Sequence, residues 1–189
     1  MKPIRSDLAD GDLAALALGG REDAYRHLLE RYREPVFRLV RSLIGESDAA
    51  RDVTQEAFIA GFAALRRYDP ERPFKSWIAR IAVNKARDWA RRRKVRAFFS
   101  RAVGLDEALG VADDAALPDV VAEDNAELAR VLAAMDRLPQ NLREVLVLRT
   151  IEEMSEAEAA QALGIGGKAV ETRLYRARKQ LVAILSSAA

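Results

Sequence analysis

Apolar residues recur at steps of three and four through most of the chain, which is the period of an amphipathic α-helix. A long run of this kind covers residues 21–44, where Pro35 predicts a bend or a restart. Gly45 suits the end of that helix, and Ser47 or Asp48 can cap the helix that follows. The alternation typical of strands is missing from the sequence, so we expect an all-helical chain.

The next two helices lie on either side of a break. One runs from residue 48 to about residue 65, and the proline-containing stretch YDPERP at residues 68–73 ends it. Ser76 can cap the following helix, which continues through the basic stretch at residues 77–96. We expect the helices of this part of the chain to form a bundle with a hydrophobic core of its own.

The helical period fails between about residues 99 and 122, where the sequence is acidic and its side chains are short. Repulsion between these charges favours an extended linker. The period returns at residues 128–138 and stops at Pro139, and a further helix is expected at residues 142–150. We therefore expect two small helical domains, at residues 1–97 and 128–189, joined by an acidic linker at residues 98–127.

The most specific local pattern lies at residues 155–181. Ser155 and Glu158 form a capping box, which satisfies free amides at the start of a helix. Gly164 suits the left-handed residue that ends this helix, and a short glycine-rich turn leads into a second one. Two short helices joined by a tight turn make a helix-turn-helix, although any small helical hairpin gives a similar pattern.

The last helix has two different faces when about 100° is assigned to each residue. Val170, Leu174, Ala177 and Leu181 lie close together on one side and are expected to face the core. The other side and its flanks carry Lys168, Thr172, Tyr175, Arg176, Lys179, Arg173 and Arg178. A helix that reads the major groove of DNA needs this arrangement. The alternative is an ordinary amphipathic helix with a basic outer face.

The stretch WIARIAVNKARDWARRRKVR at residues 77–96 also separates its charges from its apolar residues. Its apolar side is expected to face the core, Trp89 included. The cationic stripe opposite consists of Arg80, Asn84, Arg87, Arg91 and Lys94. Such a stripe attracts a phosphate backbone through counterion release. Trp77 lies at the border of the two faces, where it can either stack on a base or pack in the core.

The helix at residues 48–65 presents a polar face with one apolar residue in its middle. This face contains Asp48, Asp52, Gln55, Glu56 and the exposed Ile59, while Phe58 widens the apolar side. A polar surface with an apolar centre is typical of a docking site for a helix of another protein. An ordinary solvated face is the alternative.

Charge is distributed very unevenly along the 189 residues, although the formal net charge is only +2. Residues 1–97 contain 21 Lys and Arg and 14 Asp and Glu. Residues 98–127 contain 1 basic and 8 acidic residues, and residues 128–189 contain 9 basic and 7 acidic residues. This division supports the two domains and the linker. The chain has no cysteine, which excludes disulfides and thiolate metal sites, and a cytoplasmic protein without metal or cofactor is expected.

Three other classes of function remain as alternatives. A repressor or activator could dimerise through the first bundle and bind duplex DNA tightly by itself. A phosphotransfer enzyme could use His27, the only histidine, but paired carboxylates, a catalytic triad and a phosphate-binding glycine loop are not found in the sequence, so we expect no enzymatic activity. A helical adaptor that binds only protein would leave both basic faces without a role.

Four blocks of the sequence resemble, in order, the motifs of the extracytoplasmic-function (ECF) sigma factors, which are bacterial transcription initiation subunits. The blocks are DLAALALGGREDAYRHLLERY, DVTQEAF, RPFKSWIARIAVNKARDWARRRK and LPQNLREVLVLRTIEEMSEAEAAQALGIGGKAVETRLYRARKQL. The resemblance covers nearly all of residues 12–185. The second and third blocks are specific to the family, whereas the helix-turn-helix alone is not.

The resemblance implies a role for each surface in transcription initiation at promoters of a stress response. Asp52, Gln55, Glu56 and Phe58, with the neighbouring Asp48 and Ile59, would bind the clamp helices of core RNA polymerase. Asn84, Lys85, Arg87 and Arg91, with Trp77, Arg80 and Lys94, would read and hold open the −10 element. Lys168, Thr172, Arg173 and Arg176, with Tyr175 and Lys179, would bind the −35 element. An anti-sigma factor would hold such a protein inactive, and the active protein would be found at the nucleoid.

Several positions depart from the usual pattern of the family. An acid is usual where Arg51 stands, and valine where Thr54 stands. Lys168 and Ala169 replace a usual Gly-Thr pair at the start of the last helix, and Glu171 replaces a basic or polar residue. Polymerase binding is expected to survive the first two changes. The later three leave the sequence of the upstream promoter element open.

Overall fold

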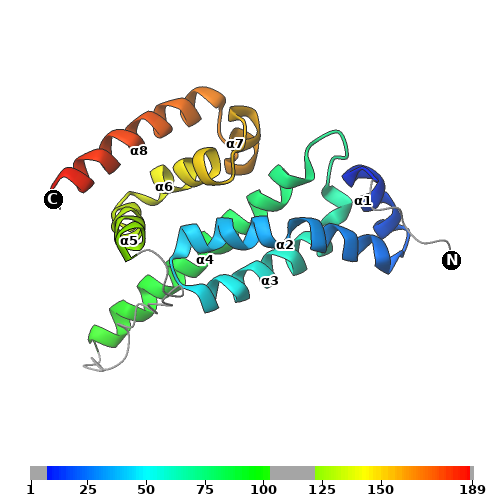
Figure 1. Ribbon diagram of the computed structural model, residues 1–189. Helices are drawn as coiled ribbons and strands as arrows, with labels where there is room; N and C mark the ends of the chain where they lie inside the picture. Colours follow the sequence, from blue (N-terminus) through cyan, green and yellow to red (C-terminus); the bar gives the residue numbers. More distant parts are fainter. Residues whose placement is uncertain (1–7, 103–121, 188–189) are drawn as a thin grey trace.

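A computed structural model describes residues 8–102 and 122–187 of the chain. All of its regular elements within these ranges are helices, which confirms the expected fold class. Figure 1 shows α1 to α4 as an elongated body and α5 to α8 as a second group lying along one side of it. The middle of the expected linker, residues 103–121, lies outside the described residues.

The helices of the first group are α1 (Asp10–Leu18), α2 (Glu22–Ile44), α3 (Ser47–Ala63), a short 3-10 turn (Leu65–Arg67) and α4 (Phe74–Ala102). Those of the second are α5 (Ala122–Asp136), α6 (Gln140–Leu146), a π-helical turn (Val147–Ile151), α7 (Glu156–Leu163) and α8 (Gly167–Ser187). The α1 helix was not expected from the sequence, and both α4 and α5 extend further toward the linker than expected.

Several helix ends are confirmed in detail. Gly45 ends α2 with φ of 78°, and its amide donates to the carbonyl of Arg41 at 2.8 Å. Ser155 and Glu158 form both hydrogen bonds of the capping box at the start of α7, and Gly164 ends that helix with φ of 66°. Because these signals depend only on neighbouring residues, they could be predicted without knowledge of the tertiary fold.

Two predicted caps are wrong. Ser47 is already the first residue of α3, and its predecessor Glu46 makes no side-chain cap. Ser76 lies inside α4 because the carbonyl of Pro73 accepts from the amides of Ser76 and Trp77, which starts the helix directly after the proline. The α2 helix also continues through Pro35 without a restart.

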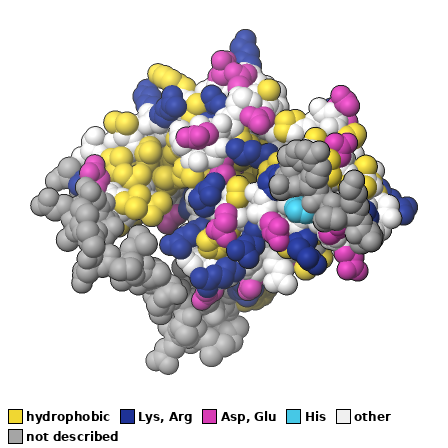
Figure 2. All heavy atoms as spheres, turned by 45° about the vertical axis from the view of Figure 1, so that its right-hand side comes forward, with side chains coloured by type: hydrophobic (Ala, Val, Ile, Leu, Met, Phe, Trp, Pro, Cys, Tyr) yellow, Lys and Arg dark blue, Asp and Glu magenta, His cyan; other side chains and the backbone are white. Residues whose placement is uncertain are grey.

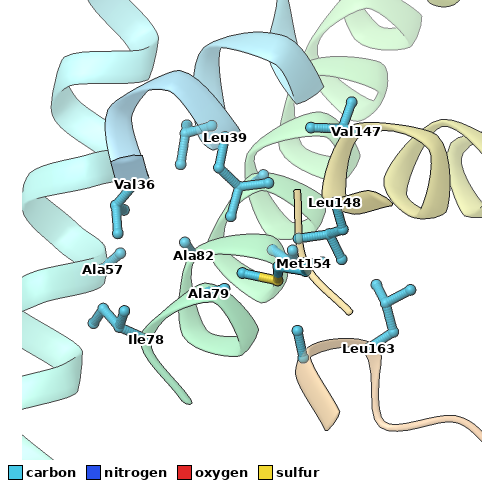
Figure 3. Packing of buried hydrophobic residues seen from close by; sticks show 14 of the residues in the cluster. Val36, Leu39, Ala57, Ile78, Ala79, Ala82, Val147, Leu148, Met154 and Leu163 are labelled. Carbon is cyan, nitrogen blue, oxygen red and sulfur yellow. The ribbon is translucent and has the colours of Figure 1, made fainter. Parts of the chain in front are cut away.

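The hydrophobic core of the first group of helices is continuous with that of the second. Ala79 and Ala82 of α4 belong to the same buried cluster as Leu148 and Met154 of the second group. Figure 3 shows these side chains in one cluster with residues of α2 and α3. The two groups of helices therefore bury apolar surface against each other.

None of the helices in the described parts of the chain is long and apolar enough to cross a membrane.

Candidate functional site

The predicted recognition face of α8 is open to solvent. Val170 and Ala177 are buried, and Leu174 and Leu181 pack partly against the core, as the helical pattern predicts. The side chains expected to contact DNA lie on the other side: Lys168, Thr172, Tyr175, Arg176 and Lys179 are exposed, and Arg173 is half-buried. The Thr172 hydroxyl donates to the carbonyl of Lys168 at 2.8 Å. This face of α8 is therefore largely accessible to solvent.

The cationic stripe of α4 has a different environment, because the second group of helices lies beside it. Arg80, Asn84, Arg91 and Lys94 are exposed, whereas Arg87 and the neighbouring Lys85 are half-buried. A crevice of about 370 Å³ between α4 and the α5–α6 connection is lined in part by Lys94. The stripe is thus only partly available to an external ligand.

Arg87 is held by an acid from the second group of helices. Its Nε and Nη2 donate to the two carboxylate oxygens of Glu144 at 2.7 and 2.6 Å. Glu144 is 1% exposed, so its charge has almost no contact with water. These hydrogen bonds raise the pKa of the Arg87 guanidinium, against a smaller opposing effect of burial. The pair is charge-assisted and bidentate, which is the strongest common geometry for these groups.

Other polar contacts cross the same boundary. Lys75 donates to the carbonyl of Glu152 at 2.6 Å, and Arg38 lies 3.7 Å from the Glu152 carboxylate. Burial raises the pKa of this carboxyl, and the two cations oppose the shift. Arg143 donates to the carbonyl of Ser42 at 2.8 Å. The interface therefore combines apolar packing with several directional contacts.

Trp77 packs among aromatic rings and is half-buried. Its ring centroid lies 5.4 Å from that of Tyr68 and 5.2 Å from that of Phe74. Trp89 is partly buried, and the guanidinium of Arg93 lies 5.2 Å from its ring centroid. Core packing thus accounts for much of the surface of both indoles, and a role of Trp77 in DNA binding stays a prediction.

A groove of about 680 Å³ lies between α2 and α3. Phe58 is 4% exposed and contributes to its lining, while Ile59 is 63% exposed at the same groove. Gln55 belongs to the lining and is exposed. Of the predicted docking residues, Asp48 and Asp52 are also exposed, but they do not line the groove. An apolar floor with a polar rim is the form of surface that accepts a helix from a partner.

Glu56 faces the basic helix rather than the groove. Its carboxylate lies 3.4 Å from Lys85 and 3.7 Å from Arg92, so it neutralises part of the charge of α4. Asp48 pairs with Arg51 at 2.7 Å, and both are exposed. Figure 2 shows one face of the molecule, on which Lys and Arg side chains lie among Asp and Glu side chains beside an area of hydrophobic side chains.

Sequence reasoning missed the contribution of α2 to the groove and the role of Glu144. Leu29, Arg33 and Phe37 line the groove at four-residue spacing, which marks a second helical stripe that could have been recognised. Glu144 is a single acid within the apolar run LREVLVL, which is an indication of a buried charge with a partner. The identity of that partner depends on tertiary packing. His27, the alternative phosphate acceptor, is half-buried on α2.

Two family descriptions match the chain. Sigma-70 region 2 matches residues 28–96, and Sigma-70 region 4 matches residues 128–181. The RNA polymerase sigma factor CnrH of Cupriavidus metallidurans is 42% identical over 95% of this chain and 95% of its own length. The ECF RNA polymerase sigma factor SigW of Bacillus subtilis is 30% identical over 86% of this chain and 89% of its own length.

A solved structure gives a similar result. The structure of CnrH in complex with the cytosolic domain of CnrY matches with a TM-score of 0.73 and 35% identity, and the match covers 96% of this chain and 100% of that one. The similarity therefore extends over both groups of helices.

Proposed function

Because the chain belongs to the extracytoplasmic-function sigma factors of bacterial RNA polymerase, we propose that it binds core RNA polymerase, directs the enzyme to promoters and helps to open the −10 element. The observation that carries this function is the presence, in one chain, of an exposed basic face on α8 and of a second basic helix, α4, in another part of the fold. The chain acts as an initiation factor rather than as an enzyme, and it needs no cofactor of its own.

The groove between α2 and α3 and its surroundings form the polymerase-docking surface. Ile59 supplies an exposed apolar contact, Phe58 supports it from below, and Gln55 offers hydrogen bonds beside it. Asp48 and Asp52 extend the surface with negative charge toward a basic partner. A docked clamp helix would bury Ile59 at the centre of a polar rim, which is where binding energy is concentrated in protein interfaces.

The stripe of α4 acts on the −10 element. Extrusion of a base from a duplex costs a few kcal/mol, so an open promoter must be stabilised by contacts to the extruded base and to its phosphates. Asn84 presents an amide that can pair with a base edge, and Arg80, Lys85, Arg87, Arg91 and Lys94 supply positive charge along the backbone. Trp77 borders this stripe at its N-terminal end.

The exposed face of α8 binds the −35 element in the major groove. Its apolar stripe anchors the helix to the rest of the domain, while Lys168, Thr172, Arg173, Tyr175, Arg176 and Lys179 face the DNA. Arginine reads guanine through two parallel hydrogen bonds, whereas contacts to phosphate carry no information on sequence.

Replacement of Arg176 with alanine is expected to weaken binding to the upstream element by about 1–3 kcal/mol, because a base contact is lost. The measurement is a titration of the assembled polymerase against promoter variants at each upstream position. Arg66→Ala removes the same charge from an exposed residue of the first group of helices and is the matched control. If the affinity fell equally for all promoter variants and only its salt dependence changed, Arg176 would contact a phosphate rather than a base.

Control by an anti-sigma factor completes the proposed function. CnrH, which resembles this chain over its full length, was solved with the cytosolic domain of CnrY bound to it. The apolar groove between α2 and α3 offers an inhibitor the same anchoring surface as it offers the polymerase. The active protein works in the cytoplasm, at the nucleoid, where the polymerase meets promoter DNA.

A further inference from the structure

The arrangement of the two groups of helices places part of the promoter-binding stripe against the protein itself. Arg80 lies close to α7: a Cβ atom placed on Gly164 would be 3.4 Å from its Nη2. Arg87 is bound to Glu144 of α6 through both carboxylate oxygens. The α8 face, by contrast, is exposed. Of the two DNA-binding surfaces of the proposed function, on which this inference rests, only the one on α4 has residues in contact with the other group of helices.

We propose that Glu144 is an autoinhibitory residue that occupies Arg87 in place of a DNA phosphate and holds the two groups of helices closed. A carboxylate presents two oxygens in a plane to the guanidinium fork, in the way that a phosphate does. Both ligands therefore need the same nitrogens, and Arg87 cannot serve both in this geometry. Separation of α6 from α4 must precede engagement of the −10 element by Arg87.

The burial of Glu144 makes the closed form specific. A charged carboxylate that is 1% exposed is stable only with a close partner of opposite charge, and Arg87 is that partner. In the closed form the Glu144 carboxylate accepts hydrogen bonds from Arg87. In the open form the carboxylate and the guanidinium are solvated by water or bind other ions. The pair thus favours one orientation of the two groups of helices over the many orientations that apolar packing alone would allow.

The turn between the π-helical segment and α7 supports the same orientation. Glu153 adopts a left-handed backbone with φ of 52°, which is unusual for a residue with a side chain. On either side of it, the carbonyl of Glu152 accepts from Lys75, and Met154 is 1% exposed within the shared core. A strained residue persists where its surroundings determine its conformation, so this turn is fitted to the surface of the first group.

Closure has a direct functional consequence. A partner that binds better to the open form shifts the chain toward it, and one that binds better to the closed form keeps Arg87 occupied by Glu144. The groove between α2 and α3 is not part of the closed interface, since its lining comes from α2 and α3 alone. Polymerase can therefore dock on the closed chain before the second group of helices moves away.

The test combines a distance measurement with a DNA-binding measurement on the full-length chain. Because the natural sequence has no cysteine, Glu71→Cys and Glu171→Cys allow fluorescent labels without background on the loop before α4 and on α8, near the turn where the two groups of helices line one pocket. Glu144→Arg is expected to lower energy transfer between the labels. It is also expected to raise the affinity of the free chain for a single-stranded −10 oligonucleotide by about tenfold, as expected for release of a charged hydrogen bond.

Controls separate the specific pair from changes in charge or folding. Glu127→Arg makes the same change in charge at an exposed position of α5 and is expected to leave both readouts unchanged. Glu144→Gln removes the charge with little change in shape and is expected to act in the same direction. The double variant Arg87→Glu with Glu144→Arg is expected to restore energy transfer, which an unfolded second domain could not do.

Unchanged energy transfer in both Glu144 variants would overturn the proposal, and so would an opened chain with unchanged affinity for the oligonucleotide. The proposed function is judged separately by transcription with the wild-type chain and core polymerase. A chain that opens and closes as expected but directs no transcription would refute the function and leave the closure intact.

Discussion

Replacement of Ile59 with aspartate is expected to weaken association with core RNA polymerase by about 2 kcal/mol or more, because this residue has the position of an interface hot spot. Ile59 is 63% exposed and lines the apolar groove between α2 and α3. A charge at this point would have to be buried without a partner when the clamp helix docks, and such burial is costly. The loss corresponds to roughly thirtyfold in the dissociation constant.

The measurement is a competition titration in which the variant and the wild-type chain compete for purified core polymerase. Leu18→Asp is the matched control, since Leu18 is an exposed apolar residue of α1 that is not part of the groove. Neither substitution should reduce the helical signal, because both side chains already face water. If the Ile59 variant competes as well as the wild type, the polymerase-docking surface lies elsewhere.

Replacement of Asn84 with alanine is expected to reduce promoter opening by about 1–3 kcal/mol, which is the range for loss of a bidentate contact between an amide and a base. Asn84 is exposed on α4, and its side-chain oxygen accepts from Arg87 at 3.3 Å. Removal of the amide leaves the apolar side of α4 unchanged, so polymerase association should be preserved. Opening can be followed by the reactivity of unpaired thymines in the −10 element.

A second asparagine provides the control for this variant. Asn141 is also exposed and helical, but it lies on α6 in the second group of helices. Asn141→Ala is expected to open promoters as the wild type does. Should Asn84→Ala do so as well, the amide is not the group that captures the base, and the assignment of the −10 surface must move along α4.

Local signals in the sequence predicted local structure well. The capping box of Ser155 and Glu158 and the left-handed Gly164 define the helix-turn-helix without reference to any other part of the chain. The two faces of α8 followed from the same helical arithmetic, and Val170 and Ala177 on its apolar side are buried. The failures at Ser47 and Ser76 concern helix starts, where a proline or a neighbouring residue can displace the cap by a few positions.

The closed arrangement could not be predicted in this way. The pattern of α4 distinguishes its apolar side from its charged side, but it does not show that α6 and α7 contact the charged side as well. In the sequence pattern, Ala79 and Ala82 are equally compatible with the inner face of a separate bundle and with a surface that packs against a second domain. The pairing of Arg87 with Glu144 joins residues 57 positions apart, and no periodicity connects them.

The docking groove is an intermediate case. The polar face of α3 and the exposed Ile59 were predicted from the sequence, and the structure places Gln55, Phe58 and Ile59 at the groove. The other wall comes from α2, and its position depends on how the two helices cross. Glu56 was also assigned to docking, yet it contacts Lys85 and Arg92 of α4, so its role in binding the polymerase stays a prediction.

Transcription from a library of genomic promoters, with purified core polymerase in the presence and absence of the chain, is the most direct test of the account. We expect a defined set of promoters to be melted and transcribed only when both proteins are present, and only weak binding of DNA by the chain alone. Tight and specific binding of duplex DNA by the isolated chain, with no promoter opened after addition of the core enzyme, would instead identify a conventional repressor or activator.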